Sequence, residues 1–133
     1  MMRRFFSALG RDRRGSPSVD FALTLPALVL MTVGVMQLGI AFLANAGLRA
    51  GVEAGARYAT VYPYPTDDQV RAKVTSSVFG MNTSQLTSPT IARGTSNGEN
   101  YVDVTATYPI TFNFVFFTTP SFNLSYTRRA YQL

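Results

Sequence analysis

The sequence predicts an α+β chain: a long N-terminal helix that crosses a membrane and continues outside it, packed against a small antiparallel sheet of about three strands and one short helix. Residues 21–48 contain no charged side chain, and at ~1.5 Å per residue a helix of that length exceeds a hydrocarbon core of ~30 Å. After residue 80 the hydrophobic period changes from helical to alternating, which is typical of strands. The 133 residues leave room for one small folded unit beside such an anchor.

Residues 1–15 hold most of the net positive charge. They contain five arginines against Asp12, a net charge of +4 out of +5 for the whole chain. Basic residues next to an apolar run mark the cytoplasmic side of a membrane, not a phosphate-binding face. We therefore predict a cytoplasmic leader over residues 1–15, a C-terminus outside, and no nucleic-acid partner.

Residues 16–62 are expected to form one long helix, with its transmembrane segment at about residues 21–45. Pro17 suits the start of a helix, because its missing N–H would lack a partner there anyway. Asp20 then falls in the first turn, where the helix dipole favours a negative charge. The helix should end at Tyr62, because Pro63 pushes the residue before it out of the helical region.

Small residues recur every fourth position in the outer part of this helix, at Gly47, Gly51, Gly55 and Ala59. Each glycine costs a helix about 1 kcal/mol relative to alanine, so three on one face call for a packing reason. Rows of small residues let two backbones approach closely. We therefore assign this row to helix packing.

Residues 63–133 should form a small extracytoplasmic α+β domain. Thr66 and Gln69 are spaced as a capping box, which predicts a short helix from there to about Phe79 with Gly80 as its C-cap. Residues 101–109 alternate apolar and polar side chains and should form the clearest strand, ended by Pro109. We expect a three-strand meander to bury the phenylalanines of residues 112–117; insertion into a membrane surface and contact with a neighbouring subunit are the alternatives.

Cysteine and histidine are both absent. This removes disulfides, thiolate chemistry and the commonest metal ligands. No nucleophile motif or phosphate-binding loop is present, and the adjacent Asp67 and Asp68 are explained as acids at a helix start. We therefore expect no enzyme activity, no cofactor and no metal site.

The N-terminal third resembles a known family. The residues RRGSPSVDFALTLPALVL at positions 13–30, followed by GARYA at positions 55–59, resemble the TadE-like family of pilin-like (pseudopilin) proteins of bacterial tight-adherence, or Flp, pilus systems. The resemblance implies cleavage between Gly15 and Ser16 by a prepilin peptidase. Asp20 and Phe21 would then be the fifth and sixth residues. The family carries Glu where this chain has Asp20, and that carboxylate is expected to pair with the N-terminal amine of an adjoining subunit.

The resemblance also implies a function. It describes a minor pilin or pseudopilin, a structural component in assembly of a Tad/Flp-type adhesive pilus, whose partners are the membrane, the peptidase and other pilin or pseudopilin subunits. The chain would cross the bacterial inner membrane once, with its N-terminus cytoplasmic and its C-terminus periplasmic, or become part of an extracellular pilus. Two alternatives stay open: an uncleaved anchor of another envelope complex, and a secreted binding protein with a signal peptide cut after Ala46.

Overall fold

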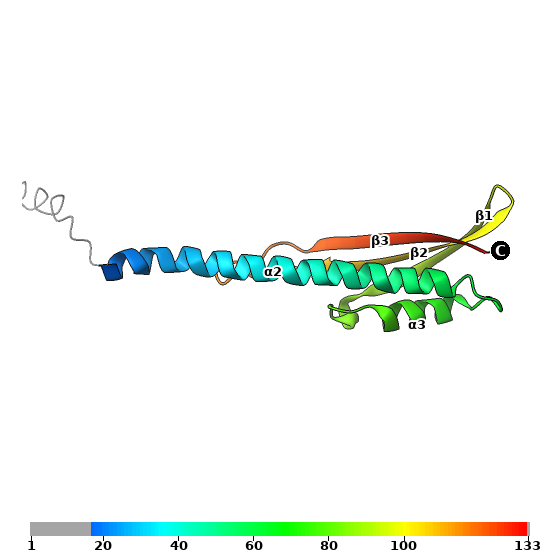
Figure 1. Ribbon diagram of the computed structural model, residues 1–133, viewed down its shortest axis with the longest axis horizontal. Helices are drawn as coiled ribbons and strands as arrows, with labels where there is room; N and C mark the ends of the chain where they lie inside the picture. Colours follow the sequence, from blue (N-terminus) through cyan, green and yellow to red (C-terminus); the bar gives the residue numbers. More distant parts are fainter. Residues whose placement is uncertain (1–16, 133) are drawn as a thin grey trace, which may run out of the picture.

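The computed structural model describes residues 17–132, so the predicted leader, Gly15 and Ser16 lie outside the described residues. The longest element is α2 (Pro17–Tyr58), an uninterrupted helix that continues through Pro26. Figure 1 shows its outer half lying along the folded domain, whereas most of its inner half extends beyond it. All buried residues of α2 lie in that outer half, from Ala44 to Ala56.

The helix α2 ends at Tyr58, before the predicted end at Tyr62. Beyond it the Arg57 carbonyl accepts hydrogen bonds from the Thr60 N–H at 3.2 Å and from the Thr60 hydroxyl at 2.8 Å. These shorter-range bonds tighten the last turn and replace the helical pattern. The chain thus leaves the helix one turn ahead of Pro63.

The short helix α3 (Asp67–Ser77) begins as predicted. Gln69 N–H donates to the Thr66 hydroxyl at 3.4 Å, and Thr66 N–H donates to the Gln69 side chain at 2.9 Å, which completes the capping box. The predicted end is wrong: the C-cap is Val78, in an extended conformation. Gly80, with a φ of +68°, follows in the next turn, where a Cβ would collide with Leu43 of α2.

Three antiparallel strands follow a 3₁₀ turn (Thr83–Gln85) and form a meander in the order β1-β2-β3. Their bounds are β1 Thr87–Ser96, β2 Glu99–Ile110 and β3 Phe122–Gln132. Asn97 and Gly98 connect β1 to β2 with φ values of 54° and 84°, the positive values that a tight hairpin turn needs. The predicted three-strand antiparallel sheet is confirmed.

Pro109 does not end β2, contrary to the prediction. It lies within the strand and faces Asn123 of β3. β1 pairs with β2 no further than Thr107, so β2 has a strand on one side only at this point. Proline is tolerated on such an edge, because its missing N–H need not break a hydrogen-bonded ladder.

The core lies between the outer half of α2, the helix α3 and one face of β2. Its largest fully buried side chains come from all three elements, and the alternation predicted for residues 101–109 is confirmed, because every second residue from Val102 to Tyr108 is buried. The alternating face of β2 thus meets the apolar faces of both helices. These core side chains are Leu48, Val52, Val70, Val74, Val102 and Val104.

The phenylalanine-rich run does not join this core, and that expectation is wrong. Its residues form a loop between β2 and β3 that lies beyond the end of α3, next to the inner half of α2 (Figure 1). Val115, Phe116 and Phe117 are 60%, 68% and 55% exposed. Among residues 17–132, no further helix or strand lies over this loop, so nothing covers these three side chains.

Candidate functional site

The inner half of α2 is an exposed apolar surface. Among the described residues, α2 is the single helix that is both long enough and apolar enough to cross a membrane. This supports a protein that crosses the membrane once. Large apolar side chains are solvent-exposed along its length, which is typical of a helix surrounded by lipid or by other apolar helices. The most exposed of them are Phe21, Leu23, Met31, Val35, Met36 and Phe42.

Asp20 lies in the first turn of α2, as predicted, and Phe21 follows it on the exposed helix. The Asp20 backbone carbonyl accepts a 2.8 Å hydrogen bond from the Thr24 hydroxyl. Among residues 17–132 no basic side chain forms an ion pair with its carboxylate. The first charged residue after it along α2 is Arg49, so Asp20 stands at the far end of an uncharged surface.

The row of small residues packs against α3 and the turn after it. A Cβ at Gly47 would collide with the backbone carbonyl of Phe79, and one at Gly51 would collide with the Val78 side chain. At Gly55 the obstacle is the Val74 side chain. The row therefore has a packing partner within its own chain, and its face is not available to a second chain while α3 is in place.

Ala59 continues this row just beyond the helix and is fully buried. Its carbonyl accepts a 2.9 Å hydrogen bond from the Gln132 side chain. Ala59 N–H donates to the Gly55 carbonyl at 2.9 Å. The end of α2 is thus tied to the last strand.

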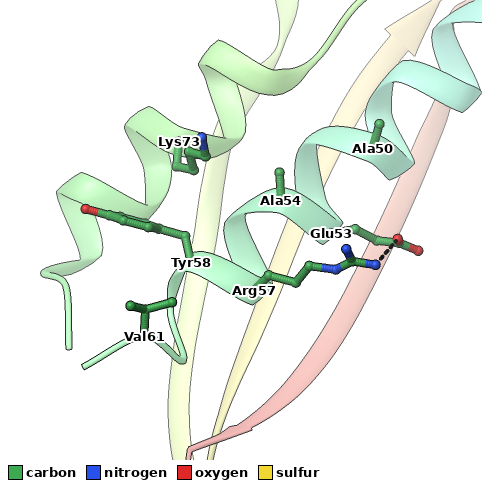
Figure 2. A pocket seen from close by; sticks show the side chains of 7 residues that line it. All are labelled: Ala50, Glu53, Ala54, Arg57, Tyr58, Val61 and Lys73. Atoms are coloured by element: carbon green, nitrogen blue, oxygen red, sulfur yellow. Dashed lines mark ion pairs between the residues drawn. The ribbon is translucent and has the colours of Figure 1, made fainter. Parts of the chain in front are cut away.

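An open groove of ≈ 490 Å³ runs between the outer end of α2 and α3. Figure 2 shows Ala50 and Ala54 along the α2 side, Lys73 on α3, and Tyr58 lying between the two helices. Arg57 and Glu53 pair across one helical turn at 4.0 Å, as their spacing predicts. The groove combines an apolar floor with two exposed cations.

The two acids in the first turn of α3 each bind an arginine. Asp68 accepts a hydrogen bond from Arg71 at 2.8 Å, and Asp67 accepts one from Arg93 of β1 at 2.8 Å. Within residues 17–132 no group of three or more acidic side chains lies close enough to hold a metal ion. The two acids serve to fasten α3 to itself and to the sheet.

Two polar contacts were not foreseen from the sequence. Asp103 and Arg129 form a two-pronged ion pair on the sheet, with both N–O distances 2.7 Å, and the guanidinium lies 4.0 Å from the centroid of the Tyr101 ring. The hydrogen bond from Arg129 holds the pKa of Asp103 below its usual range, against the opposing effect of partial burial. The alternation of residues 101–109 puts Asp103 among the polar positions of the strand, but its partner depends on the β2–β3 register.

The second contact joins the loop to α2. The Gln37 amide donates a 2.9 Å hydrogen bond to the Asn113 carbonyl. From the sequence, Gln37 is the only strongly polar side chain in the middle of the apolar run, with a neighbouring helix or the outer leaflet as its expected surroundings. The structure gives it a partner in its own chain instead.

Residues 15–57 match the family model described as TadE-like protein. The resemblance inferred from the sequence is therefore confirmed over about a third of the chain, a segment that coincides with α2. The match associates the chain with Tad pilus systems. No curated protein and no solved structure matches the chain.

Proposed function

Because residues 15–57 are TadE-like, we propose that this chain is a minor pilin or pseudopilin, a non-enzymatic structural subunit in the assembly of a Tad/Flp-type pilus. The observation that carries the proposal is the apolar inner half of α2, which nothing in the described chain covers over most of its length. Such a surface fits a bilayer before assembly. It equally fits the helices of neighbouring subunits after assembly, because both are apolar.

Asp20 supplies the proposed assembly contact. A carboxylate at one end of an apolar helix is costly to surround with other apolar helices unless a positive charge meets it. Cleavage after Gly15 would create an amine at Ser16 on each subunit. In the proposed assembly, the Ser16 amine of one subunit pairs with the Asp20 carboxylate of the next, and the subunits dock along the inner half of α2.

The glycine row is assigned a different task. Because Gly47, Gly51 and Gly55 face α3 and the turn after it, they hold the domain on the helix and leave intersubunit contacts to the exposed apolar side. This division lets the domain stay folded while the inner helix exchanges lipid for protein.

The N-terminus of the membrane-extracted protein tests the processing step. Intact-mass measurement or N-terminal sequencing should give a start at Ser16. A start at Met1 would favour an uncleaved anchor. A start at Gly47 would indicate a signal peptide and would contradict the proposal, since it removes the inner half of α2 together with Gln37 and its bond to Asn113.

Variants of Asp20 test the assembly step. Asp20→Ala should insert into the membrane normally but leave sheared pilus fractions depleted, because the amine of the next subunit then lacks its partner. Asp20→Glu is the matched control, since it keeps the carboxylate, and should assemble. Normal pilus yield from Asp20→Ala would refute the pairing.

A further inference from the structure

The described charges divide the molecule into two zones. On α2, no charged residue lies between Asp20 and Arg49. A second uncharged segment runs from β2, after Asp103, through the loop to β3, before Arg128. The two boundaries lie side by side, because the Arg49 guanidinium sits 5.3 Å from the ring centroid of Tyr126, two residues before Arg128. The uncharged half of α2 and the uncharged loop therefore lie on the same side of one boundary.

The loop, residues 111–121, runs along the uncharged part of α2. A Cβ at Gly34 would lie 3.6 Å from the Phe114 ring. If Asp20 marks the inner edge of a hydrocarbon core of ~30 Å, the outer edge falls about 20 residues further on, near Ile40. Gly34 is then about 9 Å inside that edge, at ~1.5 Å per residue. The loop accordingly reaches into the depth of the outer leaflet.

Three hydrogen bonds join the two arms of the loop. Phe114 N–H donates to the Phe117 carbonyl at 2.8 Å, and Thr119 N–H donates to the Phe112 carbonyl at 2.9 Å. Phe112 N–H donates to the Thr119 hydroxyl at 3.1 Å. Unsatisfied backbone groups are what exclude most loops from hydrocarbon, and these bonds satisfy backbone groups of Phe112, Phe114, Phe117 and Thr119.

Gln37 completes this arrangement. Its amide donates to the Asn113 carbonyl at 2.9 Å, so a polar group near the outer end of the span and a carbonyl of the loop satisfy each other. The apolar side chains at the tip, Val115, Phe116 and Phe117, are left exposed. Phe112 and Phe114 are half-buried beside α2, and the exposed tip of the loop is apolar. An exposed apolar tip fits a segment immersed in lipid.

We propose that residues 111–121 form a membrane-inserted hairpin that sits in the acyl-chain region of the outer leaflet beside α2 and fastens the domain to the bilayer before assembly. The partner is lipid because the loop surface continues the apolar surface of α2 and carries no charge that would select a protein. A cleft of ≈ 390 Å³ between α2 and the loop, lined mainly by Gly34, Leu38, Phe112, Phe114 and Phe122, has the apolar walls that an acyl chain needs. This inference rests on the proposed placement of α2 across a membrane.

Single tryptophans test the hairpin directly, because the chain contains none of its own. Full-length Phe116→Trp is reconstituted into lipid nanodiscs whose lipids carry brominated acyl chains, and its fluorescence is compared in brominated and ordinary lipid. Two reference variants bracket it. Val35→Trp probes the inner half of α2, where Val35 is 71% exposed, and Tyr62→Trp probes the far end of the domain, where Tyr62 is 84% exposed.

The expected result is that brominated lipid quenches Phe116→Trp at least half as strongly as Val35→Trp, whereas aqueous acrylamide quenches only Tyr62→Trp strongly. Quenching of Phe116→Trp by acrylamide to the level of Tyr62→Trp would overturn the hairpin. Protection of Phe116→Trp from both quenchers would indicate burial against a second protein copy and would also overturn it. Failure of brominated lipid to quench Val35→Trp would instead contradict the placement of α2, so the two failures are distinguishable.

Discussion

Gln37 of α2 and Asn113 of the β2–β3 loop are 76 positions apart in sequence and are joined by a 2.9 Å hydrogen bond. The bond connects the helix segment proposed to lie in the membrane to the loop proposed to enter it. Each partner would otherwise leave a polar group in apolar surroundings. It therefore couples the position of the loop to the position of the helix.

Replacing Gln37 by Leu should loosen the loop without unfolding the domain. The Asn113 carbonyl loses its donor, and interhelical hydrogen bonds in membranes are worth about 0.6 to 2 kcal/mol. Amide hydrogen exchange at Phe114 and Thr119 should become several-fold faster in nanodiscs. Thr32→Val is the matched control, because the Thr32 hydroxyl bonds only to its own helix at Leu28; equal exchange in both variants would argue against the coupling.

Alanine at the packed glycines should destabilise the domain. In Gly47→Ala the new Cβ meets the Phe79 backbone, which cannot move aside as a side chain would, and overpacking of this kind costs about 1 to 3 kcal/mol. Thermal unfolding of Gly47→Ala should begin several degrees lower than in the native chain.

Gly39→Ala is the control for that substitution. Gly39 lies on the same helix, but nothing lies within 4 Å of the position that a Cβ would take there, so alanine should leave the unfolding temperature unchanged or raise it. A similar loss in both variants would mean that helix flexibility, not contact with the turn after α3, is what the glycines provide.

The Asp103–Arg129 pair should make part of the stability dependent on acid. Because the pKa of Asp103 is lowered in the folded protein, its stabilising effect is fully present above the unfolded pKa of about 3.9 and is lost as the pH falls through the lower folded value. Asp103→Asn should therefore unfold at a lower temperature than the native chain at neutral pH. The two melting temperatures should converge in strong acid, below the folded pKa, and a gap that persists there would rule out ionisation as its cause.

The capping box should contribute to the attachment of α3. Thr66→Ala removes the hydroxyl that accepts from Gln69 N–H, and loss of such a cap costs about 0.5 to 2 kcal/mol. Circular dichroism during thermal unfolding should detect this loss. Thr66→Ser keeps the hydroxyl and should behave like the native chain; if serine is as damaging as alanine, the methyl group matters more than the cap.

Several features of this protein follow from local sequence alone. The long uncharged run, the capping box at Thr66 and the alternation of β2 each express preferences within one or two turns of chain. The strongest local signals were accordingly predicted with bounds close to those observed. The TadE-like pattern is also a local feature of the sequence, because it is confined to residues 15–57.

Other features were decided only by the tertiary structure. The sequence placed Gly47, Gly51 and Gly55 on one face, but whether that face meets α3 or another chain depends on where the domain folds back. The phenylalanine run is predicted to join the core because it is apolar, yet its position beyond the end of α3 leaves Val115, Phe116 and Phe117 exposed. An apolar side chain tends to avoid water, and the sequence alone predicts this. Whether other parts of the protein cover that side chain depends on how distant elements are arranged around α2.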